Sequence, residues 1–281
     1  MKIGKGWYAL FTAPLMIIFM IVVVIPFVIG IGYSFFEWDG LAKHAATFVG
    51  FSNYIDVFKD QQFLNATVRT TIFTLISVVT VNLLGIIFAL IVTTKLRVRN
   101  VARTMLFMPY LIGGLILGYI WKSVFQEFFL SIEWGNWLTD PVKSIIAMIV
   151  VTTWQLAGYV MIVYITGIMA IPADVLEAAQ VDGANYMQTL FKVKFPMLMP
   201  SFTICLFLSL SNCFKIYDVN ISLTGVGPNY QSEMFSLNIY NEIFSLSNFG
   251  YGQAKAIIFF LIIAVITLIQ VSITKKREVA L

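Results

Sequence analysis

The chain has 281 residues, of which 59% are hydrophobic and only 11% are charged. Soluble domains carry roughly 25% charged residues, so this composition excludes an ordinary soluble enzyme and indicates a protein that crosses a membrane several times. The net charge of +4 follows from basic residues beside the apolar runs, so no nucleic-acid partner is expected.

Six apolar runs predict six transmembrane helices, because each run has about the 20 residues that a bilayer-spanning helix needs. They cover Trp7–Phe35, Thr70–Thr94, Thr104–Trp121, Ser144–Ile171, Met197–Phe214 and Ala256–Thr274, and none contains Asp, Glu, Lys or Arg. The first run lacks the pattern of a cleaved signal peptide and is expected to be a retained helix. The predicted fold class is therefore an all-α, polytopic membrane protein, with one transmembrane domain over residues 1–281.

Basic residues predict the orientation, because Lys and Arg collect on the cytosolic side of membrane proteins. With the N-terminus inside, the inner segments carry Lys2, Lys5, Lys95, Arg97, Arg99, Arg103, Lys192, Lys194, Lys275, Lys276 and Arg277. The outer segments are longer in total and carry fewer basic residues. Both termini, and the segment between the fourth and fifth runs, are expected in the cytosol.

That segment, about residues 171–196, predicts two short helices outside the membrane. Asp174 favours the start of a first helix, roughly Ala173 to Asp182, through the helix dipole. Gly183 suits the left-handed position after a helix end. A second helix, with Asn185 as a possible cap, is expected to run towards Lys194 and to end at Phe195-Pro196.

The first of these helices is expected to dock on another protein. Ala178 and Ala179 keep one face slim, so the helix can enter a groove, while Glu177 and Asp182 offer charges at its rim. The alternative is a solvated loop at the membrane surface with no partner.

Three stretches resemble a known family. They are Glu177–Ala184 followed by Phe195-Pro196, the run Trp154-Gln155-Leu156-Ala157-Gly158-Tyr159, and the turn Leu223-Thr224-Gly225-Val226-Gly227-Pro228. With these stretches the chain resembles the permease subunits of type I ABC importers, most closely the maltose-type and multiple-sugar branch. In the turn, Val226 replaces the first glycine that is usual in sugar permeases.

The resemblance implies half of a channel in a bacterial cytoplasmic membrane, surrounded by lipid. A second, homologous permease subunit is expected to complete the channel. Two ABC ATPase subunits are expected to bind the EAA-like segments, here Glu177, Ala178, Ala179, Asp182 and Gly183, together with Pro196. An extracytoplasmic solute-binding protein would deliver the sugar. The chain lacks a phosphate-binding G-x-x-x-x-G-K-[ST] loop, so ATP and Mg would be held by the ATPase, and no cofactor or catalytic residue is expected here.

A neutral sugar needs hydrogen-bonding groups and aromatic faces inside the membrane, so the polar residues of the fourth and fifth runs are candidates for its pathway. They are Trp154, Gln155, Gly158, Tyr159, Ser209, Asn212 and Tyr217, of which Gly158, Tyr159, Ser209 and Asn212 are carried over from the resemblance. The alternative for each is a hydrogen bond between helices that only holds the bundle together. Lys215 and Asp218, spaced i,i+3, are expected to form a structural or gating pair.

Three other functions compete with this interpretation. A secondary transporter or channel would work alone, but a proton-coupled carrier usually has acidic residues or histidine within its spans. A membrane enzyme or metal site is disfavoured because His44 is the only histidine. The strongest alternative is an ABC importer permease for an amino acid, a polyamine or phosphate, since these share the EAA-like segment.

Overall fold

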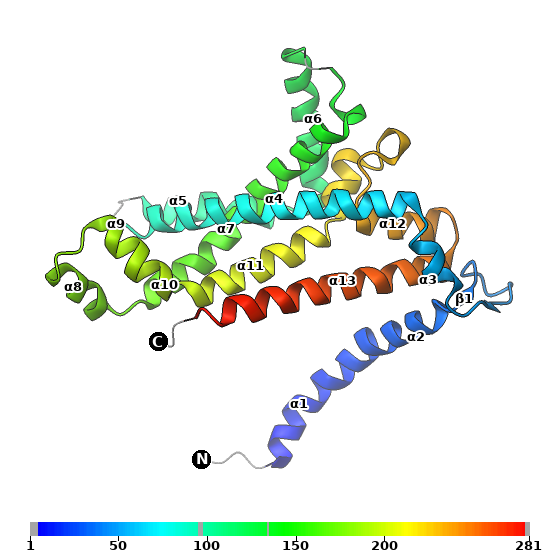
Figure 1. Ribbon diagram of the computed structural model, residues 1–281, viewed down its shortest axis with the longest axis horizontal. Helices are drawn as coiled ribbons and strands as arrows, with labels where there is room; N and C mark the ends of the chain where they lie inside the picture. Colours follow the sequence, from blue (N-terminus) through cyan, green and yellow to red (C-terminus); the bar gives the residue numbers. More distant parts are fainter. Residues whose placement is uncertain (1–4, 95–97, 134, 279–281) are drawn as a thin grey trace. The chain divides into compact units, whose positions relative to one another are not determined.

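A computed structural model describes residues 5–94, 98–133 and 135–278 of the chain, which are mostly helical (Figure 1). Three basic residues used to predict the orientation, Lys2, Lys95 and Arg97, lie outside the described residues. The backbone divides into two compact units, one of residues 1–61 with 239–260 and the other of residues 62–238 with 261–281.

The first unit contains the N-terminal helices and a small hairpin. Its elements are α1 (Lys5–Phe19), the π-helical turn η1 (Met20–Val24), α2 (Ile25–Tyr33), β1 (Phe36–Glu37), β2 (Thr47–Phe48), α3 (Ser52–Val57), the π-helical turn η7 (Asn241–Ser245) and the beginning of α13 (Phe249–Lys275). The strands pair antiparallel, with Phe36 opposite Phe48. The buried Lys255 ammonium forms ion pairs of 2.8 Å with Asp60 and 2.6 Å with Glu242, which tie α13 to the rest of this unit.

The second unit is a bundle of long helices. Its elements are α4 (Gln61–Val92), α5 (Arg99–Phe107), the 3-10 turn η2 (Met108–Leu111), α6 (Gly114–Ser131), the 3-10 turn η3 (Trp137–Thr139), α7 (Pro141–Ala170), α8 (Ala173–Val181), α9 (Tyr186–Gln188), the π-helical turn η4 (Thr189–Lys194), α10 (Phe195–Met197), α11 (Met199–Phe214), the π-helical turn η5 (Asn220–Thr224), the 3-10 turn η6 (Pro228–Tyr230), α12 (Phe235–Tyr240) and the end of α13. The Tyr164 hydroxyl donates to the Asn82 amide oxygen (2.9 Å), and the Asn82 amide donates to the Ser209 hydroxyl (2.8 Å). These bonds join α7, α4 and α11 in the core.

The helices agree with six predicted spans by length and composition. Four helices of the described chain are long and apolar enough to cross a membrane, and two further pairs qualify if each bent pair is one span. Helices α4, α6 and α13 extend beyond the predicted runs and carry Arg69, Lys122 and Lys255 on these extensions. The guanidinium of Arg69 donates to backbone carbonyls of the 230–233 segment, so the folded chain supplies acceptors for this charge.

The third predicted span, Thr104–Trp121, is not one straight helix. It is divided between α5–η2 and α6, which are inclined by 98°. Pro109 lacks the N–H that an α-helix needs, and the chain tightens into η2 around it. Ile112 and Gly113 then adopt extended backbone angles, with ψ of 126° and 137°.

The second short helix does not end at Phe195-Pro196 as predicted but one residue later, at Met197. The helical path continues through α10 and bends by 66° into α11, at Leu198. In the wide π-helical turn before it, the Phe195 N–H already bonds five residues back to the Leu190 carbonyl. The spacing of the backbone hydrogen bonds therefore changes just before Pro196, which has no N–H to donate. The helix can thus contain this proline.

Candidate functional site

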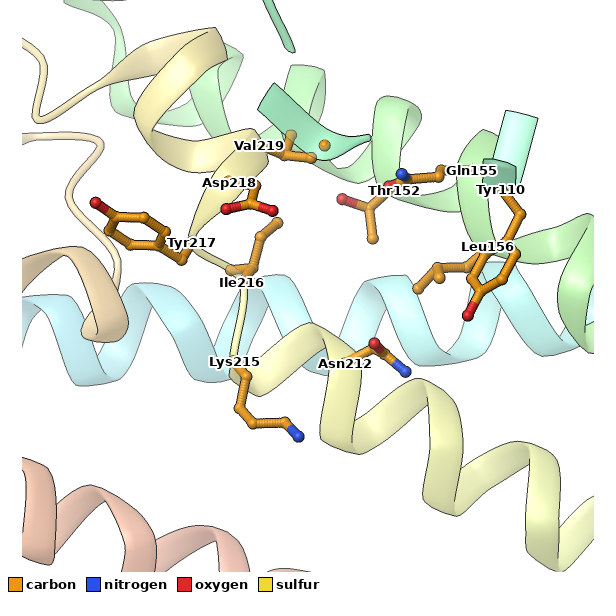
Figure 2. A pocket seen from close by; sticks show the side chains of 11 residues that line it. Tyr110, Thr152, Gln155, Leu156, Asn212, Lys215, Ile216, Tyr217, Asp218 and Val219 are labelled. Carbon is orange, nitrogen blue, oxygen red and sulfur yellow. The ribbon is translucent and has the colours of Figure 1, made fainter. Parts of the chain in front are cut away.

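A cavity of about 270 Å³ lies within the second unit, between α7, the end of α11 and the segment that follows α11 (Figure 2). Its polar lining residues are Tyr110, Thr152, Gln155, Asn212, Lys215, Tyr217 and Asp218. They come from three separate parts of the sequence, so the fold is needed to bring them together.

Helix α7 supplies one wall of the cavity and is itself fixed to the bend after η2. The Gln155 amide donates to the Ile112 carbonyl at 3.0 Å, which holds the bend against α7. One turn away, Thr152 is 4% exposed and its buried hydroxyl has no hydrogen-bond partner among the described residues. An unpartnered buried hydroxyl is costly, so Thr152 is available to a polar ligand in the cavity.

Two glycines of α6 allow the opposite wall to come close. A Cβ atom on Gly114 would lie 2.8 Å from the Cβ of Asp218, and one on Gly118 would overlap the Ser222 side chain. Since each additional carbon would push the chains apart, the Gly-x-x-x-Gly spacing lets α6 pack directly on the 218–223 segment.

The charged residues of the cavity do not form the expected pair. In the described part of the chain, no ion pair joins Lys215 to Asp218. Helix α11 ends at Phe214, so the i,i+3 spacing does not put the two side chains on one helical face. The cavity thus offers one ammonium, one carboxylate, amides, a hydroxyl and two phenols, a set whose formal charges sum to zero.

Three predicted pathway residues, Gln155, Asn212 and Tyr217, line this cavity. Tyr159 does not line it but stacks on Tyr110, which does. Ligand contact by these residues stays a prediction.

The other three predicted pathway residues lie elsewhere. Trp154 lines an apolar groove on another face of α7. Gly158 packs against the Leu106 carbonyl, where a Cβ atom would overlap the oxygen. Ser209 is buried and bonded to Asn82. Their positions do not test whether these three residues contact a ligand, so that contact stays a prediction.

The hairpin of α8 and α9–α10 forms as its sequence predicts. Gly183 has φ of +77°, the left-handed region that disfavours side chains. Its N–H bonds to the Gln180 carbonyl (3.0 Å), and the Ala184 N–H bonds to the Ala179 carbonyl (2.9 Å), which together make a Schellman motif. Asn185 and Gln188 then exchange side-chain to backbone bonds in a capping box that starts α9.

The hairpin presents an exposed surface with both apolar and charged groups. Glu177, Ala178, Asp182 and Gly183 are exposed, whereas Ala179 and Pro196 are partly buried. Between its two helices lies a cavity of about 280 Å³, lined by Leu176, Gln180, Ala184, Tyr186, Thr189 and Lys194. Val181, at 86% exposed, stands out from the end of α8. Such exposed apolar side chains on a short, rigid hairpin are typical of a protein interface.

Residues 81–279 match the family described as binding-protein-dependent transport system inner membrane component. This range covers α7, the hairpin and all polar residues of the cavity. The chain belongs to this family. The expectation of an importer permease, raised by the EAA-like stretch, is thereby confirmed.

Relatives of this permease match it over nearly its whole length. It is 45% identical to a probable starch degradation products transport system permease protein of Thermoanaerobacterium thermosulfurigenes, over 97% of this chain and 95% of the relative. It is 32% identical to a multiple sugar-binding transport system permease protein of Streptococcus mutans, over 99% and 98%. The fold matches a chain of a solved bacterial ABC transporter for alginate import, with TM-score 0.80, 22% identity and coverage of 97% and 96%.

Sequence reasoning missed Tyr110 and Thr152 in this permease. Tyr110 lies just before the 98° bend, and only that bend turns it towards α7. The signals were present, since Pro109 and the Gly113-Gly114 pair both disfavour a continuous helix. Thr152 carried no such signal, because a threonine inside a membrane helix usually bonds to its own backbone.

Proposed function

We propose that this chain is the permease subunit of an ATP-driven, binding-protein-dependent importer of sugars, and that the cavity between α7 and α11 is part of the sugar's path. The observation that carries the proposal is the 45% identity, along 97% of the chain, to a permease named for starch degradation products. The relative named for multiple sugars supports the same class of cargo.

The chemistry of the cavity supports a neutral, polyhydroxylated ligand. Amide groups of Gln155 and Asn212 can donate and accept, the Thr152 hydroxyl has no hydrogen-bond partner among the residues that the structure describes, and Tyr110 offers an aromatic face. A polyamine or phosphate would favour a lining of one charge sign, whereas here Lys215 and Asp218 offset each other. The relatives named for sugars make the permease for a non-sugar solute the weaker candidate.

The complete importer would contain more than this chain. A second homologous permease would supply the other half of the path, and an extracytoplasmic solute-binding protein would deliver the sugar. Two ABC ATPase subunits would hold ATP and Mg and would bind the hairpin through Glu177, Ala178, Ala179, Asp182, Gly183 and Pro196. This chain is then a transporter subunit and performs no catalysis. It acts as one transmembrane domain over residues 1–281 in a bacterial cytoplasmic membrane, with both termini in the cytosol.

Alternating access is the mechanism that this assembly supports. Binding of ATP would draw the ATPases together and move the hairpins as rigid bodies, and the cavity would open to the other side of the membrane. The Schellman motif and capping box favour such a role, because a hairpin fixed at both helix ends transmits displacement without unfolding.

Reconstitution tests the function directly. The chain is purified with its partner subunits and placed in vesicles with the solute-binding protein, and uptake of radiolabelled short glucose oligomers is compared with uptake of an amino acid, a polyamine and phosphate. The expected result is uptake of the sugar only, and only with ATP. Sugar uptake at full rate without nucleotide, or preferential uptake of a non-sugar solute, contradicts the proposal.

A further inference from the structure

An apolar groove of about 510 Å³ lies in the second unit, on a different face of α7 from the polar cavity. Leu83, Leu84 and Phe88 of α4, Met105 and Leu106 of α5 and Trp154 of α7 contribute to its walls. Trp154 is 43% exposed there. The proposed function makes no use of this groove.

Positive charge gathers beside one end of the groove. Residues 95–103 contain four basic residues, and no Asp or Glu occurs anywhere between residues 61 and 126. Of the four, the structure describes Arg99 and Arg103, both on α5. Arg103 is three residues before Leu106 of the groove wall, so the two are neighbours on the helix surface.

Arg103 has capacity for a further acceptor. One of its terminal amino groups donates to the Val92 carbonyl at the end of α4 (3.4 Å), while its Nε is buried with no partner among the described residues. A buried guanidinium donor without an acceptor is costly. Phosphate oxygens suit a guanidinium particularly well, because its planar donors match their geometry.

Helix α5 has the pattern of a helix at a membrane surface. Ala102 and Leu106 pack on the core, whereas Val98, Val101 and Met105 are each more than half exposed. Arg99, the first residue of α5, is also exposed. Basic residues beside an exposed apolar stripe are typical of segments that contact anionic lipid.

We propose that the groove and α5 bind one anionic phospholipid of the inner leaflet, with an acyl chain along α4 and α7 and the phosphate at Arg99 and Arg103. The combination of an apolar body with a basic end matches the tail and head of such a lipid. A helix of the second permease would fill the groove without needing the arginines. The inference rests on the proposed cytosolic placement of residues 95–103, where the leaflet carries negative lipid.

Fluorescence of Trp154 tests this proposal, because that side chain lines the groove. The full-length chain is reconstituted in vesicles that contain phosphatidylglycerol or phosphatidylcholine with the same brominated acyl chains, which quench tryptophan on contact. Subtracting the quenching of Trp154→Phe from that of the wild type isolates Trp154 from the other tryptophans. Phosphatidylglycerol is expected to quench Trp154 at a mole fraction more than tenfold lower than phosphatidylcholine.

Charge variants locate the headgroup. Arg99→Gln, at an exposed position that tolerates change, is expected to reduce the phosphatidylglycerol preference about fivefold, and Arg99→Gln with Arg103→Gln is expected to abolish it. Lys275→Gln with Lys276→Gln removes two exposed basic residues from the end of α13 and is expected to leave the preference unchanged.

Three outcomes overturn the proposal: equal quenching by the two lipids, a preference that Arg99→Gln with Arg103→Gln leaves undiminished, and no quenching of Trp154 by either lipid, which would indicate a groove filled by protein. The readout needs neither sugar nor ATP. Failure of sugar uptake would therefore leave it intact, and failure of lipid binding would leave the proposed transport function untouched.

Discussion

Tyr159 of α7 stacks on Tyr110 of η2, with ring centroids 4.4 Å apart and ring planes inclined by 10°. Of these two residues only Tyr110 lines the polar cavity, so Tyr159 supports the Tyr110 ring without lining the cavity itself. The stack joins α7 to the bent segment between α5 and α6. It fixes an aromatic face where a sugar ring would pass.

Loss of the supporting ring is expected to weaken sugar binding. A stacked aromatic pair contributes about 0.5–1.5 kcal/mol beyond its burial, so Tyr159→Ala should raise the sugar concentration for half-maximal uptake about twofold to twelvefold. Tyr159→Phe retains the stacked ring and should transport like the wild type. The measurement is ATP-dependent uptake at several sugar concentrations. Unchanged uptake by Tyr159→Ala at every concentration would show that the stack has no part in binding.

The hairpin illustrates how much of this protein is encoded locally. Gly183 and Asn185 specify a helix end and a helix start from their own backbone and side-chain chemistry, and the structure has both features where the sequence predicts them. The six apolar runs could also be identified from the sequence alone, because each is a continuous stretch of about 20 apolar residues, the length that a membrane-spanning helix needs. Family membership followed from the same local patterns.

The cavity is different because it depends on contacts between distant segments. Gln155 and Asn212 could be named from the sequence as polar residues within apolar helices. Tyr110 could not, since it reaches them only through the bend at Ile112–Gly113 and the close approach at Gly114. Ser209 is a predicted pathway residue like Asn212, and its hydroxyl accepts a hydrogen bond from Asn82 in the core. Sequence identifies such polar groups, but it does not show which partners they have in the fold.

The rigid turn at Gly183 is expected to be needed for coupling. Gly183→Val forces a β-branched residue into the left-handed region, where even ordinary side chains cost about 1–2 kcal/mol. The hairpin should distort, and ATP-driven uptake and stimulation of the ATPase should be lost while membrane insertion is retained. Glu177→Lys, which reverses a charge on the exposed face, should have the same effect without changing the turn.

Gly135 provides the matched control for this change. It also has positive φ (+75°), and a Cβ atom added there meets no atom of the described residues within 4 Å beyond its chain neighbours. Gly135→Val introduces comparable backbone strain in a loop far along the chain from the hairpin, and coupling should persist. If Gly183→Val and Gly135→Val impair uptake equally, the strain rather than the hairpin is responsible.

Close packing of α7 on α5 is expected to make Gly158 intolerant of any side chain. A Cβ atom there would overlap the Leu106 carbonyl, and a backbone atom cannot move aside as a flexible side chain can. Gly158→Ala should therefore lower the free energy of unfolding by about 1–3 kcal/mol or more. Thermal unfolding of the purified chain in mild detergent measures the change.

Gly32→Ala is the control for Gly158→Ala, since an added Cβ at Gly32 in α2 meets no described atom within 4 Å beyond its own helix backbone and chain neighbours. Alanine is favoured over glycine in a helix by roughly 0.5–1 kcal/mol, so this variant should have an equal or higher Tm. A Gly158→Ala protein as stable as Gly32→Ala would contradict the packing argument.

Stability at acid pH is expected to depend on Asp140, which caps α7 ahead of its membrane-spanning part. Its carboxylate accepts from the backbone N–H groups of Lys143 (3.3 Å) and Val142 (2.9 Å). These bonds, that of Lys143 foremost, hold the pKa of Asp140 below its ordinary value of 3.8. A group whose pKa is depressed by folding stabilises the protein above its unfolded pKa, and this contribution disappears as the pH falls through the folded pKa.

Asp140→Asn isolates the charge from the cap, because the amide oxygen still accepts from both N–H groups. The wild type should have the higher Tm at neutral pH, and the difference between the two proteins should shrink as the pH falls below 3.8. Asp140→Ala removes the acceptor as well and should have a reduced Tm throughout. Thermal unfolding of the three proteins in detergent, from about pH 7 down to about pH 3, measures these differences. A constant difference between the wild type and Asp140→Asn across that range would show that the ionised cap adds nothing.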